Sequence, residues 1–378
     1  MSRTDPIIDS DFPGGNIVVD SVDGDLISLH QDLRDTFVNW FYWYFRIRGA
    51  AGRTLEFRFT ASDAIGVRGP AVSVDDGRHW SWLGEEAVQG QSFTFTFPLQ
   101  ADSVHFSFTI PYLEAHLQAF LARYSRHPHL RIGTLCRTKR GRDVEMLHLG
   151  HLDGSPDFRV LLMGRHHACE AIATYSMEGM LEAVLTQTGL GAWLREHVEF
   201  LVIPFMDKDG VEEGDQGKRR RPYDHWEDYG EGSIYPTVQA VKKRVPAWSE
   251  GKLRFILDFH CPAIRGGSHE RIHFVGGPDR DNWRRVERFC AILEQTRTGP
   301  LPYGVNNNLA YGDEWNVDYG PRQTSERWGE ALPEVLASSV VEIPYANVDG
   351  EMVTPESARA FGWDLATALH KFLAEPRI

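Results

Sequence analysis

The chain has 378 residues, of which 42% are hydrophobic and 25% are charged, and its formal net charge is -13. This length and composition favour a globular protein with two domains, and the acidic balance argues against non-specific binding of nucleic acid. The sequence has no run of about 18 apolar residues that would span a membrane, and residues 1–15 lack the apolar core of a signal peptide. We therefore expect a cytoplasmic protein with no nucleic-acid or membrane partner.

The first hundred or so residues alternate apolar and polar side chains in the way that half-buried strands do. The alternation runs through residues 55–60, 93–97 and 104–110, and residues 39–48 are rich in Trp, Phe and Tyr. A period of two places each apolar set on one face of an antiparallel sheet. Several short strands separated by turns therefore predict an antiparallel β-sandwich domain over residues 1–112.

The pattern changes after residue 112, where short apolar runs begin to alternate with longer amphipathic ones. Helices are expected at 113–124 and 171–186 and from Pro355 onward, with buried strands at 159–163, 200–204, 254–258 and 339–343. This alternation predicts an α/β domain over residues 113–378, with helices on both faces of a sheet. Ligands in such folds bind beyond the carboxyl ends of the strands, which is where we place His167, His260 and Glu342.

Two imidazoles and one carboxylate near these strand ends form a candidate metal site. His167 and Glu170 lie three residues apart after an apolar run, and His260 ends a second apolar run. Two histidines and one acid, with a fourth position left to water, make up a catalytic zinc site. The HxxE spacing alone is a weak signal, and Glu170 could instead be a helix-start glutamate at a favourable position in the helix dipole. If the three residues converge, the sequence predicts a metal-dependent hydrolase with one zinc ion.

A second motif, His269-Glu270-Arg271-Ile272-His273, has the HExxH spacing of another class of zinc protease. That motif requires a helix, on which residues four apart share one face. Glycine pairs flank the motif here, and its apolar residues favour a strand, on which residues four apart are separated by roughly 13 Å. We therefore do not expect this motif to bind the metal.

Four segments resemble the zinc carboxypeptidase family in their order and spacing. They are Gly164–Glu170, Ile203–Val211, Asp258–His260 and Val341–Ile343. The alternating β region that ends at Ile110-Pro111-Tyr112 resembles the amino-terminal domain of the cytosolic carboxypeptidase branch of that family. The resemblance implies an α/β fold in which an antiparallel β-sandwich is followed by a zinc-carboxypeptidase-like mixed sheet with helices on both sides.

The resemblance also implies a role for each site residue. It implies that zinc is held by His167, Glu170 and His260. Glu342 would be the general base that takes a proton from water, and Arg220 would polarise the scissile carbonyl and stabilise the oxyanion. Without the resemblance, Glu342 could instead be an ordinary ion-pair residue at a strand end, and Arg220 could be one of four solvated basic residues.

One departure from the family pattern concerns substrate capture. Where the family has an Asn-Arg pair that grips the terminal carboxylate of the substrate, the aligned positions here are Trp226 and Glu227. A substrate carboxylate facing Glu227 would be repelled. Either Arg265 or Arg322 substitutes for the missing arginine, or the substrate presents a neutral or cationic group, or the alignment is shifted. Candidates for the family tyrosine that closes over the substrate are Tyr303, Tyr311 and Tyr345.

We therefore expect a zinc-dependent hydrolase of carboxypeptidase type that acts on a peptide or acyl-amino-acid bond. Two alternatives stay open. The protein could be a non-catalytic zinc-binding or partner-binding protein that kept the metal and lost substrate capture. It could also be an amidoacid deacylase, an enzyme class with the same type of fold and ligand set.

Overall fold

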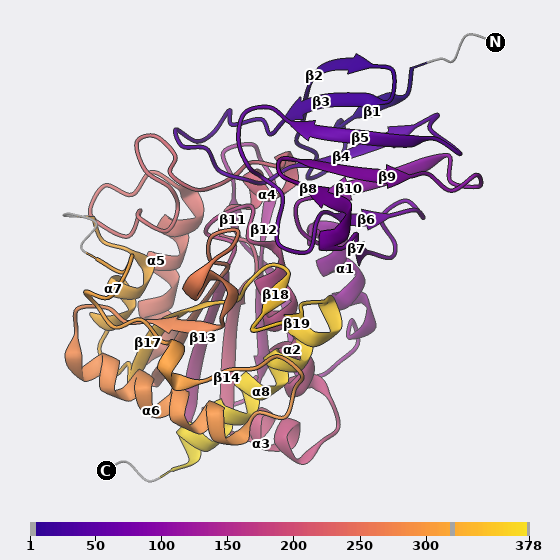
Figure 1. The fold of residues 1–378 in the computed structure, drawn as a ribbon. Coiled ribbons are helices and arrows are strands. Elements are labelled where there is room, and N and C mark those ends of the chain that lie inside the picture. The colour runs from indigo at the N-terminus through magenta and orange to yellow at the C-terminus, as the bar shows by residue number, and fades with distance from the viewer. Residues whose placement is uncertain (1–4, 318–321, 376–378) are drawn as a thin grey trace.

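Three large sheets carry the architecture of the protein, and helices pack on both faces of the largest (Figure 1). The computed structural model describes residues 5–317 and 322–375. Two five-stranded sheets lie between residues 7 and 107, and a seven-stranded sheet lies in the remainder of the chain. The amino-terminal sheets border α4 (Lys208–Glu213), and the backbone N–H of Gly14 donates to the carbonyl of Glu212 in that helix.

The two amino-terminal sheets are antiparallel apart from one strand pair. The first has the order β1-β4-β10-β6-β7 and the second the order β2-β3-β5-β9-β8. Their strands are β1 (Ile7–Asp9), β2 (Val18–Asp23), β3 (Leu26–His30), β4 (Tyr44–Arg48), β5 (Thr54–Phe59), β6 (Ala71–Ser73), β7 (Ser81–Trp82), β8 (Val88–Gln89), β9 (Ser92–Thr96) and β10 (Ser103–Ser107). The predicted antiparallel arrangement is confirmed except that β3 and β5 pair in parallel.

Aromatic side chains from both amino-terminal sheets form the core between them. Phe57 of β5 lies 5.6 Å from Phe45 of β4 and 5.3 Å from Phe106 of β10, measured between ring centroids. The predicted alternation is present, since Phe57 and Phe59 are buried while Arg58 between them is exposed. Each buried aromatic ring contributes about 1.5–3 kcal/mol of hydrophobic stabilisation, which holds the two sheets face to face.

The large sheet is mixed, as predicted, and has the order β11-β12-β14-β13-β15-β17-β16. Its strands are β11 (Leu130–Arg137), β12 (Asp143–Gly150), β13 (Phe158–Gly164), β14 (Val198–Ile203), β15 (Leu253–His260), β16 (His273–Val275) and β17 (Ala337–Glu342). The four central strands β14, β13, β15 and β17 run parallel, and the outer strands join them antiparallel. Each of the four predicted strands overlaps one of these central strands.

Helices cover both faces of the large sheet. One face packs against α2 (Ala171–Leu185), α3 (Gly189–His197), α6 (Arg280–Thr296) and α8 (Pro355–Ala374), and the other against α5 (Pro236–Ser249) and α7 (Ser325–Glu330). In β13, Val160 and Leu162 point to the first group, while Leu161 and Met163 point to the second. This alternation within an entirely apolar run is typical of a parallel strand buried on both faces. The remaining short elements are α1 (Glu114–Arg123), β18 (Asn347–Val348), β19 (Glu351–Met352) and three 3-10 turns.

The HExxH segment forms no α-helix. Residues Gly267–Glu270 form a 3-10 turn, and strand β16 begins only at His273. The strand prediction is therefore correct for His273 and wrong for His269. The reason lies in the preceding glycines, since Gly266 and Gly267 have positive φ angles of 87° and 57° that start the turn.

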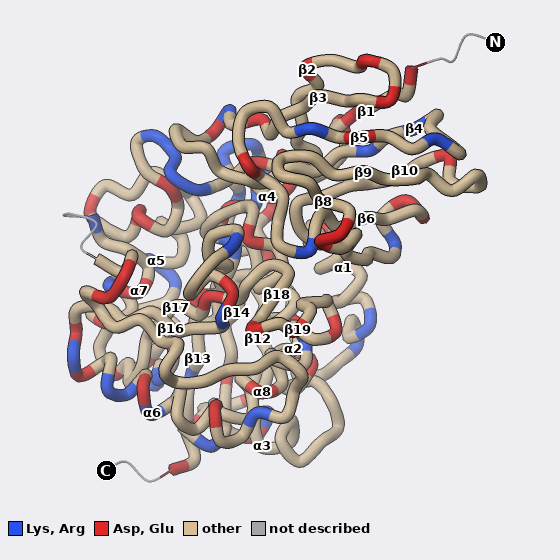
Figure 2. The backbone as a smooth tube through the Cα atoms, in the orientation of Figure 1, with Lys and Arg blue, Asp and Glu red and all other residues tan. Residues whose placement is uncertain are grey.

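Acidic and basic residues are interspersed along both parts of the chain (Figure 2). The central strands carry few of them, and β13 and β14 contain one charged residue each. Within residues 5–317 and 322–375, no helix combines the length and the apolar composition that crossing a bilayer requires.

Candidate metal centre

The carboxyl ends of the neighbouring strands β13, β15 and β17 bring the predicted metal-site residues together. β15 ends at His260 and β17 ends at Glu342, and these two residues are opposite each other in the strand pair. The chain leaves β13 through Arg165, whose φ of 59° lies in the left-handed region. This turn places His167 and Glu170 immediately before helix α2, so all four side chains reach the same edge of the sheet.

His167, Glu170 and His260 converge on one point. Glu170 Oε1 lies 2.8 Å from His167 Nδ1, and Glu170 Oε2 lies 2.8 Å from His260 Nδ1. The two Nδ1 atoms are 3.2 Å apart, and all three side chains are buried. Two ring nitrogens this close cannot both carry a proton, whereas a cation could accept both lone pairs. Two imidazoles and one carboxylate fit a zinc site with an open fourth position.

Asp224 and Asp258 contact the other ring nitrogens of the two histidines. His260 Nε2 lies 3.0 Å from Asp258 Oδ2, and His167 Nε2 lies 3.6 Å from Asp224 Oδ2. A carboxylate in the position of Asp258 orients a metal-binding imidazole, whereas the 3.6 Å separation of Asp224 from His167 is too long for a hydrogen bond. Burial would lower the pKa of His260, but the charges of Asp258 and Glu170 raise that pKa well above its ordinary value.

His166, Asp258 and His260 form a second group of potential ligands whose atoms lie within 4.8 Å of one another. Other partners already engage this group. His166 Nδ1 lies 2.9 Å from Asp258 Oδ1, and His166 Nε2 lies 2.8 Å from the hydroxyl of Tyr229. Ser325 Oγ donates to Asp258 Oδ2 at 2.5 Å. We therefore interpret this group as support for the first one.

Glu342 lines the same pocket as His167 and His260. Its side chain is buried, and Oε2 has no hydrogen-bond partner among the described residues. Burial, followed by the charge of Glu170, raises the pKa of Glu342 to about 7. A carboxylate with a pKa near the working pH is suited to accept and release a proton.

Trp226 and Glu227 also line the pocket, beside Trp40 and Trp315. Glu227 Oε2 forms an ion pair of 2.8 Å with Arg322 Nη1. A second nitrogen of that guanidinium, Nη2, donates to the carbonyl of Pro222 at 2.8 Å. The residue at the clamp position is therefore a carboxylate that is already bound to an arginine at the edge of the pocket.

Arg220, in contrast, is not among the residues that line the pocket. Its Nη2 atom lies 2.7 Å from Asp207 Oδ2 and 2.9 Å from Asp215 Oδ2, and its Nε atom lies 3.0 Å from Asp35 Oδ2. Three carboxylates thus draw this guanidinium away from the metal ligands. The expected place of Arg220 beside the scissile carbonyl does not match this position.

Lys218 and Arg219 are the basic residues of this run that line the pocket. Lys218 Nζ lies 3.4 Å from Glu170 Oε1. Arg219 has a φ of 53°, and this left-handed residue turns the chain so that Lys218 and Arg220 face opposite sides of the segment.

Arg265 and the candidate tyrosines lie outside the pocket lining, whereas His269 of the HExxH segment lines the pocket. Arg265 pairs with Asp63 at 2.9 Å. Tyr345 is buried with its hydroxyl 3.7 Å from Cys169 Sγ. Tyr303 donates to Asn308 Oδ1 at 3.1 Å, and Tyr311 is 39% exposed. The positions of these three tyrosines do not identify any of them as the residue that closes over the substrate.

Sequence reasoning missed several residues of the site, among them Asp258, Lys218, Asp224 and Trp40. Asp258 stands two positions before His260, and this Asp-x-His spacing could have indicated an orienting carboxylate. Lys218 stands in the same basic run as Arg220, but no spacing rule distinguishes it from its neighbours. Asp224 and Trp40 reach the site only through the fold, since Trp40 comes from the amino-terminal domain.

Two family models match the chain. The cytosolic carboxypeptidase N-terminal domain matches residues 8–109, and the zinc carboxypeptidase family matches residues 113–232. Together these matches cover more than half of the chain. They correspond to the amino-terminal sheets and to the segment that carries His167, Glu170 and Lys218.

Curated relatives and solved structures show the same likeness. An uncharacterised protein of Zymomonas mobilis is 28% identical over 54% of this chain and 54% of its own length, and human cytosolic carboxypeptidase 2 is 25% identical over 54% of this chain. This chain spans about half the length of the first relative and 27% of the second.

Among solved structures, a metallo-carboxypeptidase from Burkholderia cenocepacia has a TM-score of 0.76 at 20% identity, covering 98% of this chain and 99% of its own. A metallo-carboxypeptidase from Pseudomonas aeruginosa has a TM-score of 0.75 at 18% identity, covering 97% of this chain and 99% of its own. At these identities the comparison establishes a shared fold that extends over both parts of the chain.

Proposed function

Because the chain belongs to the zinc carboxypeptidase family, we propose that it is a zinc-dependent hydrolase of metallocarboxypeptidase type that cleaves a peptide or related amide bond. The observation that carries this proposal is the convergence of His167, Glu170 and His260 on one point, with Glu342 in the same pocket. One zinc ion held by these three residues would supply Lewis acidity to the substrate carbonyl. A cytoplasmic location and the absence of a nucleic-acid partner stay predictions.

Glu342 acts in this proposal as the general base. It lies at the end of β17 opposite His260, and its Oε2 atom has no hydrogen-bond partner among the described residues. The carboxylate accepts a proton from the attacking water and passes it to the leaving amine. A positioned base of this kind contributes about 10²–10⁴-fold to the rate.

In this proposal Lys218 takes the role that the resemblance implies for Arg220. Its ammonium faces the pocket near Glu170, whereas Arg220 is held by three carboxylates. The ammonium stabilises the negative charge that develops on the carbonyl oxygen, which is often worth about 3–4 kcal/mol in the transition state.

Trp226 and Glu227 shape substrate capture in this proposal. A free substrate carboxylate at the clamp position would meet the carboxylate of Glu227, which repels it. We propose that the substrate, a peptide or an acyl-amino acid, presents a neutral or cationic group there. Paired peptides with a free and an amidated carboxyl end test this directly, and we expect the amidated peptide to be cleaved at least as fast.

The decisive experiment measures hydrolysis of a peptide library with and without a chelator, then with Glu342→Gln. We expect the chelator to abolish hydrolysis and Glu342→Gln to lower kcat by about 10²–10⁴-fold. Zinc analysis of the Glu342→Gln protein is the control, since its metal content should equal that of the unmodified protein. Hydrolysis that survives both treatments would exclude the mechanism.

A second candidate is a non-catalytic zinc-binding protein that has lost substrate capture. The ion pair between Glu227 and Arg322 favours it, because this pair occupies the place of the family's carboxylate clamp. Stoichiometric zinc without turnover of any amide would support this candidate. A third, the amidoacid deacylase, is distinguished by release of an acyl group in place of a terminal amino acid.

A further inference from the structure

We infer that the amino-terminal domain is a working part of the active site, because Asp35 and Trp40 position Lys218 in the pocket. Both residues lie in the segment between β3 and β4. The inference rests on the proposed function in assigning chemistry to Lys218. The positioning itself rests on contacts between the two parts of the chain.

Asp35 holds the backbone immediately before Lys218. Its Oδ1 atom accepts from the backbone N–H of Gln216 at 3.0 Å, and its Oδ2 atom accepts from the backbone N–H of Gly217 at 2.8 Å. The same Oδ2 atom accepts from Arg220 Nε at 3.0 Å. One carboxylate therefore fixes both ends of the turn on which Lys218 stands.

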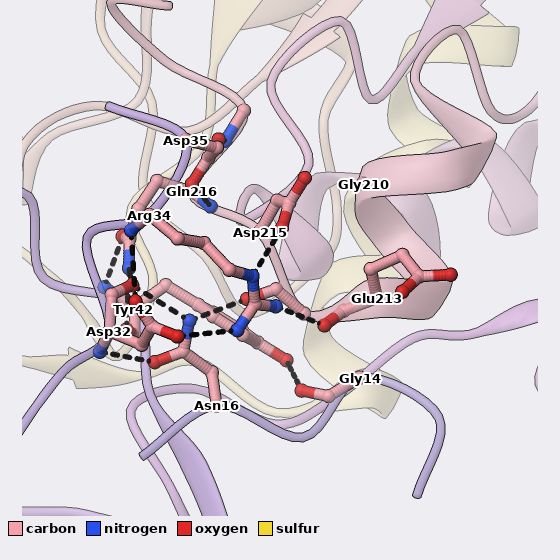
Figure 3. A network of polar contacts seen from close by, with 12 residues as sticks. Gly14, Asn16, Asp32, Arg34, Asp35, Tyr42, Gly210, Glu213, Asp215 and Gln216 are labelled. Carbon is pink, nitrogen blue, oxygen red and sulfur yellow. Dashed lines mark hydrogen bonds and ion pairs between the residues drawn. The ribbon is translucent and has the colours of Figure 1, made fainter. Parts of the chain in front are cut away.

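The segment is tied to the amino-terminal domain at further points (Figure 3). The side chain of Gln216 donates to the carbonyl of Tyr42 and accepts from its backbone N–H, each at 2.8 Å, and Asn16 Nδ2 donates to the carbonyl of Gly214 at 2.7 Å. Gln216 and Asn16 are both buried. Buried hydrogen bonds of this kind are costly to break, because each lost partner leaves a desolvated polar group.

Gly217 shows how closely this segment approaches the metal ligands. Its φ is 74°, and a Cβ atom at this position would come within 2.1 Å of the backbone nitrogen of Ala168. Ala168 directly follows His167, so the segment is in backbone contact with the metal-site turn. A shift of the segment would therefore displace Lys218 relative to Glu170.

Trp40 forms the wall behind Lys218. The ammonium lies 5.2 Å from the centroid of the Trp40 ring, a distance at which a cation is attracted to the ring face. Trp40 stacks on Phe41 at 4.5 Å, and Phe41 packs edge-on against Tyr345 at 5.9 Å. The Trp40 indole is thus held in place by Phe41 and lies beside the ammonium, which contacts Glu170.

The test measures the accessibility of Lys218 in the full chain as purified. Asp35→Asn removes one acceptor from the turn, and Trp40→Leu removes the wall. The matched control is Asp63→Asn, since Asp63 also joins the two parts of the chain, through Arg265 at 2.9 Å, without contacting this segment. The measurements are the rate of Lys218 acetylation by acetic anhydride, followed by peptide mass spectrometry, and hydrogen exchange of residues 214–218.

We expect Asp35→Asn to speed both Lys218 acetylation and amide exchange several-fold. Trp40→Leu should speed acetylation and leave amide exchange unchanged, and Asp63→Asn should change neither. Equal acetylation and exchange rates in Asp35→Asn and the unmodified protein would overturn the inference. So would equal changes in Asp35→Asn and Asp63→Asn, because these would indicate a general loosening of the domain contact.

Measuring hydrolysis by the same variants distinguishes this inference from the proposed function. If Asp35 acts through Lys218, kcat/KM should fall in Asp35→Asn, and the double variant Asp35→Asn/Lys218→Met should fall no further than Lys218→Met. Additive losses would contradict the coupling. Faster acetylation with hydrolysis that resists Glu342→Gln would refute the proposed function and leave the positioning intact.

Discussion

Two neighbouring clusters of charged side chains differ in how completely their polar atoms are paired with one another. In the first, the guanidinium of Arg220 lies within 3.0 Å of oxygens of Asp35, Asp207 and Asp215. A second arginine, Arg34, pairs with Asp215 Oδ1 at 3.0 Å. Each of the three carboxylates therefore lies beside a guanidinium, and Asp207 Oδ2 is the one buried oxygen of the cluster that lacks a well-aligned hydrogen bond among the described residues.

The second cluster, at the metal site, is incomplete. Glu342 Oε2 has no hydrogen-bond partner among the described residues, and the Nδ1 atoms of His167 and His260 face each other at 3.2 Å. Buried polar groups are normally satisfied within a protein. The comparison teaches that the matched cluster supports the fold, whereas the unmatched one is arranged for a ligand.

The largest expected effect comes from removing a ligand of the unmatched cluster. Replacing a partner of a metal ligand already costs about 10–100-fold in metal affinity, so His260→Ala should lower zinc affinity by more than this and abolish hydrolysis. Competitive zinc titration and turnover measure both effects. Asp258→Asn is the matched control, with an expected loss within that range. Unchanged zinc binding in His260→Ala would break the comparison.

Replacing a residue of the matched cluster should lower the free energy of unfolding. Arg220→Met leaves the buried Asp207 and Asp215 and the partly buried Asp35 without their shared cation, which costs about 3–5 kcal/mol. Urea unfolding measures this change. Arg265→Met provides the control, since the ion pair of Arg265 is partly exposed and should be worth about 0–1 kcal/mol. Equal losses of unfolding free energy in the two variants would show that the Arg220 cluster stabilises the fold no more than an exposed ion pair does.

Lys218→Met should lower activity more than stability, because Lys218 belongs to the pocket. We expect kcat/KM to fall by about 10²–10³-fold, with a smaller loss of unfolding free energy than in Arg220→Met. Steady-state kinetics and urea unfolding on the same preparations measure both. Lys218→Arg keeps the charge and should recover part of the activity. A variant that keeps full kcat/KM would remove Lys218 from the mechanism.

The smallest effect concerns Glu330 in α7, a carboxyl that accepts from Asn282 Nδ2 at 2.9 Å. Burial, followed by the charges of Glu326 and Asp279, raises the pKa of Glu330 to about 8. The unfolded value is about 4.3. The stabilisation by the protonated form is therefore complete below pH of about 4 and is lost as the pH rises towards 8.

Glu330→Gln, which mimics the protonated form, should match the unmodified protein near pH 4. Near pH 9 it should be more stable by about 1–2 kcal/mol, less than the full shift implies because the side chain is partly exposed. Urea unfolding at both pH values is the measurement. The same difference at both values would show that Glu330 does not titrate as described.

Local chemistry and strand topology made much of the metal site predictable. The parallel strands end at one edge of the sheet, so His167, His260 and Glu342 could be expected to meet there from their positions after apolar runs. The α/β sheet with helices on both faces and most of the amino-terminal pairing followed from periodicity in the same way, whereas the mixed character of the sheet followed from the resemblance to the family. Each of these expectations depends on patterns that are visible within a few residues.

The expectations that did not hold depend on distant contacts. Lys218 and Arg220 are two residues apart in one basic run, and the carboxylate of Asp35, far away in the sequence, is one of three that hold Arg220 outside the pocket lining. The parallel pairing of β3 with β5 was likewise not predicted, because periodicity does not specify which strands become neighbours or in which direction they run. Trp40 enters the site through packing between the two parts of the chain.

His260 and Glu342 are opposite each other at the ends of β15 and β17. The site should therefore tolerate no change in the length of these strands. Side chains alternate between the two faces of a strand, so deleting one residue within β17 would turn Glu342 towards the helices. A deletion in the loop between β18 and β19 would have no such effect on the sheet. Natural variation in length should accordingly be absent from β17 and concentrated in loops, and insertion scanning of the gene would reveal the same asymmetry.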